Sequence, residues 1–215
     1  MVKCEFANGL NRSSHDFQWK MRCDMQGQGM VKLGHDFGKF IDPKYYADII
    51  AGNDEVGCIL RLQLISDRFL DVYLSERVPD ESRKFFAKGK NGTILTYFKE
   101  KLMVAIAYGL PTQLGEALVY LNKIRNDFGH NFEKTLSHSD LDNYIIAVDH
   151  FRYKALVPYL GEGPIKDMVI QSDGKRLTVA DGLAVGFVIA TYCLMIRAGL
   201  WLVDDLQSRG KLKLG

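Results

Sequence analysis

The sequence has no large excess of charge of either sign, which limits the partners that it attracts. Its 215 residues contain 28 lysines and arginines against 26 aspartates and glutamates, so the formal net charge is +2. A protein that binds nucleic acid through its overall field carries a larger basic excess. Any contact with RNA or DNA therefore depends on a local group of basic residues.

Cysteine is also scarce, and the sequence has no C-x-x-C pair. The cysteines are widely separated, at Cys4, Cys23, Cys58 and Cys193. This usage is typical of reduced thiols in the cytosol rather than of a disulfide framework. Two of them alternate with histidines in the order Cys4, His15, Cys23, His35, at spacings of 11, 8 and 12 residues. Those spacings match no common zinc finger, so we expect no metal and no other cofactor.

No uncharged apolar run is long enough to cross a membrane. The uncharged stretch 182–196 contains 15 residues and is bounded by Asp181 and Arg197, whereas a bilayer requires about 18 to 20. The N-terminus also lacks the basic region and apolar core of a secretory signal. We therefore expect a cytoplasmic protein without a membrane segment, in which the last helix lies in the core.

Hydrophobic periodicity divides the chain into two parts. Residues 1–40 keep no period of 2 or 3.6, which predicts an irregular or flexible N-terminal arm. Residues 41–210 follow a helical pattern, which predicts one all-α domain. Helices are expected at 43–50, 53–77, 93–108, from 112 to the end of the apolar segment near 130, at 139–156 and at 178–207. Residues 168–172 are compatible with a strand or a turn.

An arginine lies within the apolar stripe of the helix that begins near residue 112. On a helical wheel this stripe consists of Leu114, Ala117, Leu118, Leu121, Ile124 and Phe128. Arg125 falls in the middle of the stripe. A charged side chain directed at a core is costly unless it has a partner, a ligand or a cleft. We therefore expect Arg125 to point inward.

Asp67 has the equivalent position on the helix expected at 53–77. The stripe of that helix contains Val56, Ile59, Leu60, Leu70 and Leu74, and Asp67 lies near its centre. Because the two helices are expected to pack together, we predict that Asp67 meets Arg125 directly and fixes its guanidinium. The alternative is a purely structural ion pair.

The stretch 123–130 contains the pattern R-N-x-x-x-H, formed by Arg125, Asn126 and His130. This pattern resembles the HEPN superfamily. A longer similarity, over about residues 50–205, is to its mannitol operon repressor (MltR-like) branch. The matching segments are Ser66-Asp67-Arg68, Ala107-Tyr108-Gly109-Leu110, the R-N-x-x-x-H motif, and residues 176–200. The resemblance implies a helical bundle with a long apolar C-terminal helix, often dimeric, and in many members metal-independent endoribonuclease activity.

A fixed cation beside a group that titrates near neutral pH suits chemistry on a phosphodiester. The resemblance implies that Arg125, Asn126 and His130 are catalytic. Orienting roles are expected for Asp67 and Asp127, and contacts with RNA or phosphate for Arg61 and Arg68. The alternatives are that Arg125 is a buried ion-pair partner, that His130 only favours the dipole at a helix end, and that Arg61 and Arg68 are solvated or lie at an interface.

Two arrangements bring the motif together. Residues five apart on a continuous helix point about 140° apart, so Arg125 and His130 do not share a face. In the first arrangement, Gly129 ends the helix and lets His130 turn toward Arg125. In the second, another copy of the chain supplies the missing groups across a two-fold axis. The resemblance implies the second arrangement, a homodimer.

Three functions remain open at this point. The first is a ribonuclease of the toxin or defence type, with RNA as substrate and an antitoxin as partner. The second is a non-enzymatic transcriptional regulator or interaction protein. The lack of a helix-turn-helix signature argues against direct operator binding, so such a regulator would act through a partner protein. The third is a sensor of a nucleotide or phosphate ligand.

Overall fold

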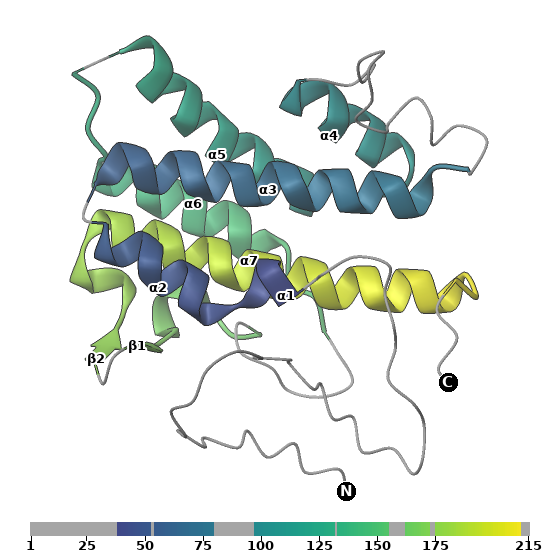
Figure 1. Ribbon diagram of the computed structural model, residues 1–215. Coiled ribbons are helices and arrows are strands. Elements are labelled where there is room, and N and C mark those ends of the chain that lie inside the picture. The colour runs from purple at the N-terminus through teal and green to yellow at the C-terminus, as the bar shows by residue number, and fades with distance from the viewer. Residues whose placement is uncertain are drawn as a thin grey trace, which may run out of the picture.

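The chain forms a bundle of helices, which confirms the all-α prediction (Figure 1). The computed structural model describes residues 38–52, 54–79, 97–131, 133–154, 162–172 and 175–211. The helices are α1 Gly38–Ile41, α2 Pro43–Ala51, α3 Glu55–Arg77, α4 Phe98–Ala107, α5 Thr112–His130, α6 His138–His150 and α7 Leu183–Ser208. A hairpin of two short strands, β1 Ile170–Ser172 and β2 Lys175–Leu177, precedes α7.

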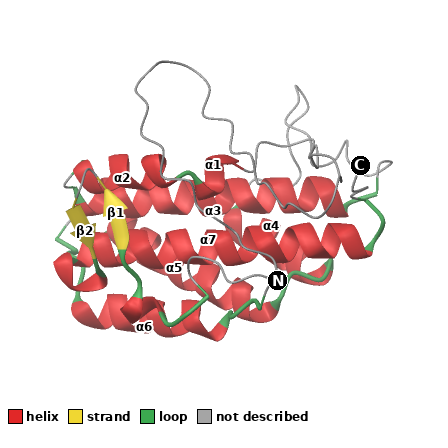
Figure 2. Ribbon diagram, turned by 90° about the horizontal axis from the view of Figure 1, so that it is seen from below, coloured by secondary structure: helices red, strands yellow, loops and turns green. Residues whose placement is uncertain are grey.

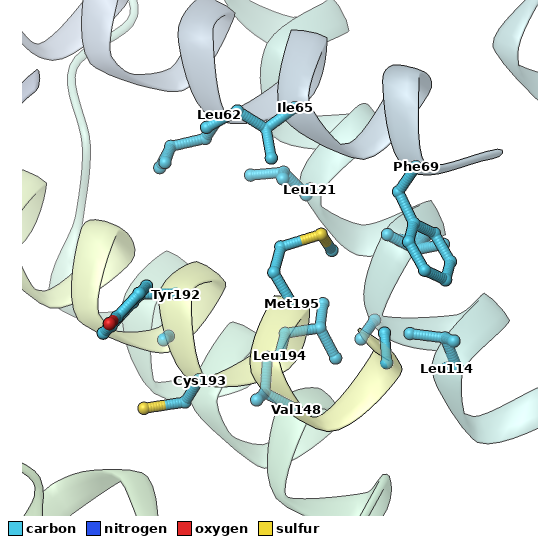
Figure 3. Close-up of a cluster of buried hydrophobic side chains, with 14 of the residues drawn as sticks. Leu62, Ile65, Phe69, Leu114, Leu121, Val148, Tyr192, Cys193, Leu194 and Met195 are labelled. Carbon is cyan, nitrogen blue, oxygen red and sulfur yellow. The ribbon is translucent and has the colours of Figure 1, made fainter. Parts of the chain in front are cut away.

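Helix α7 is the centre of the bundle. It contacts α1, α2, α3 and α6, and α5 completes the packing by contacting α3 and α6. Figure 3 shows the resulting cluster, in which Leu62 and Phe69 of α3 meet Leu121 of α5 and Leu194 and Met195 of α7. All five of these side chains are almost completely buried. Apolar area removed from water at this junction is the main force that holds the helices together.

Helix α7 is also the one described helix that is long and apolar enough to span a membrane. However, 67% of its most apolar window is buried inside the chain. A helix that is hydrophobic on all sides is expected in the core of a helical bundle. The prediction that the last helix is a core helix is therefore confirmed.

Helix α3 spans 23 residues and is defined by clear end signals. The Asp54 side chain accepts hydrogen bonds from the backbone N–H groups of Val56 and Gly57, at 3.1 and 2.9 Å, and so caps the first turn. At the other end Val78 is extended, as expected for a residue before Pro79. The predicted helix at 53–77 is confirmed to within two residues.

The structure corrects the end of α6, which stops at His150 instead of continuing to residue 156. The buried guanidinium of Arg197, from α7, donates to the carbonyl oxygens of Val148 and Phe151 at 2.7 and 3.2 Å. These acceptors belong to the last turn of α6 and its C-cap, where carbonyl groups lack helical partners. A side chain from another helix thus caps α6.

The start of the last helix is also corrected, from residue 178 to Leu183. Thr178 and Asp181 form a capping box around a single 3-10 turn, and Gly182 then adopts a φ of 145°, a conformation that favours glycine. Before this turn, β1 pairs antiparallel with β2, Ile170 opposite Leu177. Residues 170–172 are therefore a strand, and the hairpin lies beside α2 at one end of the bundle (Figure 2).

The described helical region begins at Gly38, slightly before the predicted boundary at residue 41. Phe40 in α1 is buried, and Tyr46 of α2 donates a hydrogen bond to its carbonyl oxygen at 2.7 Å. The remainder of the predicted N-terminal arm, with its four candidate zinc ligands, lies outside the described residues, as does residue 93 at the start of the helix predicted at 93–108.

Candidate functional site

The R-N-x-x-x-H motif lies on the last two turns of α5. The helix continues through Gly129 to His130, and the N–H of Asn131 donates to the carbonyl of Asp127 at 3.0 Å. Gly129 therefore does not release the chain within the motif, and the turn that would bring His130 to Arg125 in one chain is absent. Within one copy the two side chains leave the helix in directions about 140° apart.

The prediction that Arg125 points into the core is wrong. Its side chain is exposed, whereas Leu121, Ile124 and Phe128 of the same stripe are buried. The cause is the angle between helices, because the C-terminal end of α5 leans away from α3 (Figure 1). The sector of α5 that faces α3 is covered near Leu118 but open to solvent at Arg125.

Arg125 interacts with its own neighbour in the motif. Its Nη1 atom donates a hydrogen bond to Oδ1 of Asn126 at 3.0 Å. Within the described part of the chain it forms no ion pair, which leaves the other guanidinium donors available to a ligand. Asn126 and Asp127 are half-buried, and His130 is exposed. The Asp127 side chain makes no hydrogen bond to the described atoms of Arg125 or His130.

The predicted contact between Asp67 and Arg125 is also wrong. The Asp67 carboxylate pairs with Lys101 of α4, whose Nζ atom lies 3.0 and 2.9 Å from its two oxygens. The same amine lies 2.8 Å from Oδ1 of Asp71, one turn further along α3. Asp67 thus fixes α4 onto α3, and it does not orient the guanidinium of the motif.

The helices run antiparallel, which explains why Asp67 and Arg125 do not meet. Nε2 of Gln63 donates to Oδ1 of Asn122 at 3.3 Å, and the N–H of Leu136, after α5, donates to Glu55 at the start of α3 at 3.0 Å. Asp67 lies one turn beyond Gln63 in one direction, and Arg125 nearly one turn beyond Asn122 in the other. At 1.5 Å per residue they are about 10 Å apart along the helix axes.

Helix α4 covers only half of the surface that α3 and α5 share. It covers the second half of α3 through Lys101 and the first half of α5, where Ile106 lies against Gly115. The other half is exposed, and we call it the open α3–α5 face. Its exposed members are Val56, Leu60, Arg61, Leu64 and Arg68 of α3 and Val119 and Arg125 of α5. Gln63 lies below them with a buried Oε1 atom that has no hydrogen-bond partner among the described residues.

Three buried cations have structural partners, and sequence reasoning did not identify them. Lys101 is one. Burial alone would lower its pKa, but hydrogen bonds to Asp71 and Asp67 outweigh burial, so the pKa of Lys101 is raised. Arg197 is completely buried and also donates to Asp149 and to the Gly163 carbonyl, at 3.3 and 2.8 Å. The one feature of the sequence that pointed to Arg197 was its position directly after the uncharged stretch 182–196.

Arg77 is the third buried cation, at the C-terminal end of α3. Its Nε donates to the Tyr73 hydroxyl at 3.0 Å, and a second nitrogen donates to the Tyr108 carbonyl. Its Nη1 lies 3.4 Å from Asp205 of α7. Burial raises the pKa of Asp205, although the charge of Arg77 opposes this change. Arg77 thus joins the C-terminal ends of α3, α4 and α7, at the end of α3 opposite to the one near the motif.

The described residues offer little support for other chemistries. They contain no group of three or more histidine, cysteine, aspartate or glutamate side chains that could hold a metal ion. Cys58 and Cys193 are buried, and burial raises the pKa of each thiol to about 12. A thiol with so high a pKa is a poor nucleophile at neutral pH. The motif on α5 is therefore the best-supported site.

Comparisons with known proteins add no relative. No protein-family model, no curated protein and no solved structure matches this chain.

Proposed function

We propose that this chain is a HEPN-type protein that acts as a homodimeric, metal-independent endoribonuclease of the toxin or defence type in the cytoplasm. One observation carries the proposal. Arg125, Asn126 and His130 lie together on an accessible helix end, and the guanidinium is held by an amide side chain instead of a carboxylate. An arginine without an acidic partner keeps its full positive charge for a phosphate.

The chemistry follows from the three side chains. His130 acts as general base on a ribose 2′-hydroxyl or as general acid on the leaving 5′-oxygen. Arg125 binds the phosphoryl oxygens and stabilises the charge that develops on them. Asn126 holds Arg125 in place, as its 3.0 Å hydrogen bond indicates. The products are a 2′,3′-cyclic phosphate and a 5′-hydroxyl, and DNA is spared because it lacks the 2′-hydroxyl.

A second copy is required by this mechanism. Arg125 and His130 diverge on one continuous helix, so a single chain offers the phosphate a cation or an imidazole but not both from one side. Two copies related by a two-fold axis place the arginine of one beside the histidine of the other. Arg61 and Arg68, which are exposed on α3, are then available to contact RNA on either side of the cleaved bond.

The test uses purified protein, structured and single-stranded RNA, and excess EDTA. We expect cleavage of RNA but not of DNA of the same sequence, and loss of cleavage in His130→Ala and Arg125→Ala. His150→Ala is the matched control, because His150 is likewise an exposed histidine at the last position of a helix, α6. Absence of cleavage in the native chain, or equal loss in the control, would overturn the proposal.

The alternative is a regulator or interaction protein, like the mannitol operon repressor, that works through another protein. The observation in its favour is the row of exposed apolar side chains on α3 beside the motif. A chain that forms a stable complex with a partner but cleaves no RNA in the same assay would support this alternative. A sensor of a nucleotide or phosphate ligand would use Arg125 in the same way without cleavage.

A further inference from the structure

Three aliphatic side chains form a continuous row on the open α3–α5 face. Val56 is 41% exposed, Leu60 39% and Leu64 67%. Residues four apart on a helix lie on the same side, so the three side chains form a straight row about 12 Å long. Isolated exposed apolar residues are common, but a row of them along the junction of two helices is typical of an interaction surface.

The row is flanked by cations that have no acidic partner in the described chain. Arg61 and Arg68 lie along its solvent side on α3, and Arg125 lies on the neighbouring helix α5. All three are exposed, and the hydrogen bond from Arg125 to Asn126 leaves its charge uncompensated. The surface thus combines an aliphatic centre with a basic rim. Complementarity requires an occupant with an apolar strip bordered by negative charge.

Other occupants fit this surface less well. RNA has the negative charge, but its backbone gains little from three aliphatic side chains, because bases prefer aromatic surfaces for stacking. A second copy centred symmetrically on the row itself, and not at the motif end of α5, would bring Arg61 and Arg68 toward their own counterparts. The four longest segments outside the described residues, 1–37, 80–96, 155–161 and 212–215, each contain at least as many basic as acidic residues. An acidic occupant therefore comes from another protein.

We propose that the open α3–α5 face binds an acidic amphipathic helix of a partner protein. Its apolar side chains, at spacings of four residues, cover Val56, Leu60 and Leu64. Its carboxylates on either side of that strip face Arg61, Arg68 and Arg125. A helix of about three turns matches the length of the row. The docking stands without the proposed function, but one consequence rests on it: a bound acidic helix occupies Arg125 and so excludes RNA.

The experiment measures fluorescence anisotropy with two synthetic helical peptides and the full chain. Both peptides have leucines at i, i+4 and i+8. One carries glutamates on the flanks, and the other carries lysines at the same positions. We expect the acidic peptide to bind at least about tenfold more tightly than the basic one, a difference of about 1.4 kcal/mol. We also expect its affinity to fall with added salt.

Variants locate the binding site. Leu60→Ser with Leu64→Ser, and separately Arg61→Glu with Arg68→Glu, should each weaken binding of the acidic peptide by about tenfold or more. Ile146→Ser on α6 and Arg176→Glu on β2 are matched controls, because each is an exposed residue of the same type on another element. The controls should leave the affinity within about twofold, and circular dichroism checks that all variants fold.

Several results would overturn this proposal. Equal binding of the two peptides, no binding of either, or binding unaffected by the leucine variants each contradicts an acidic helix on this face. If sedimentation shows a dimer that the leucine variants dissociate, and no peptide binds, the occupant is a second copy. If the leucine variants weaken RNA binding alone, the occupant is RNA. Peptide binding by a chain that cleaves no RNA would overturn only the proposed function.

Discussion

The two halves of α3 present the same side of one helix to opposite surroundings. In the first half this side carries Val56, Leu60 and Leu64, and they are exposed. In the second half it carries Asp67 and Asp71, and α4 covers both carboxylates through Lys101. The apolar half faces water and the charged half faces protein. Burial here follows the position of a neighbouring cation instead of the hydrophobicity of the residue.

Whether a cationic side chain of this protein is buried depends on whether a carboxylate pairs with it. The Lys101 side chain is 7% exposed and has two carboxylate partners at 3.0 Å or less. Arg125, which has no carboxylate partner in the described chain, is exposed. A buried charge without partners would cost several kcal/mol, so only paired cations enter the core. The unpaired arginines stay outside, where they are available to a ligand.

The largest effect on this comparison is expected from Lys101→Met. Methionine leaves Asp67 and Asp71 partly covered and without their shared cation. Removing one member of a buried ion pair costs about 3–5 kcal/mol, and the partial exposure of the carboxylates reduces this to about 2–3 kcal/mol. The free energy of unfolding from urea titration measures the change. A loss below about 0.5 kcal/mol would show that α4 is held without the ion pairs.

A smaller effect is expected when the whole charged cluster is replaced. Lys101→Met combined with Asp67→Leu and Asp71→Leu removes all three members of the ion-pair cluster between α3 and α4. Apolar replacement of a complete buried ion cluster is often neutral or stabilising. We expect the triple variant to recover most of the stability that Lys101→Met loses. A triple variant as unstable as the single one would show that the geometry of the cluster, and not the unpaired charge, matters.

The pH dependence of the unfolding free energy tests the same ion pairs of Lys101. Despite the opposing effect of burial, hydrogen bonds to Asp71 and Asp67 raise the pKa of Lys101 above its ordinary value of 10.5. A raised pKa in the folded state means that this stabilisation is complete below about pH 10.5 and is lost as the pH rises through the folded pKa. The unfolding free energy of the native chain should therefore fall more steeply above pH 10.5 than that of Lys101→Met. Parallel curves would contradict this assignment.

The smallest effect is expected on the apolar half. Leu64→Ser changes a side chain that is 67% exposed, so the stability should change by less than about 0.5 kcal/mol. Leu62→Ala is the internal comparison on the buried side of the same helix, and removing its completely buried side chain should cost about 2–5 kcal/mol. Thermal or urea unfolding distinguishes the two. A large loss in Leu64→Ser would mean that this row packs within the chain.

Sequence periodicity predicted the helices well and their orientation poorly. The stripe of α5 is buried as expected, because residues three and four apart must share a face whatever covers it. The direction of Arg125 depended on where α5 leaves α3, and no local pattern contains that angle. The predicted pairing of Asp67 with Arg125 failed for a related reason, because the antiparallel offset between the helices, which the sequence does not contain, leaves the Asp67 carboxylate beside Lys101 of α4.

The sequence by itself determined the class of the fold, the extent of α2, α3 and α5, the core position of α7, and the motif of Arg125, Asn126 and His130 as a candidate site. These features depend on spacing along one chain, and helical geometry translates such spacing directly into structure. Only the tertiary structure decided which charges are buried, which half of α3 is covered, and that Arg125 and His130 diverge on one helix. Those properties depend on the angles and offsets between helices, which are set by the packing of all the side chains together.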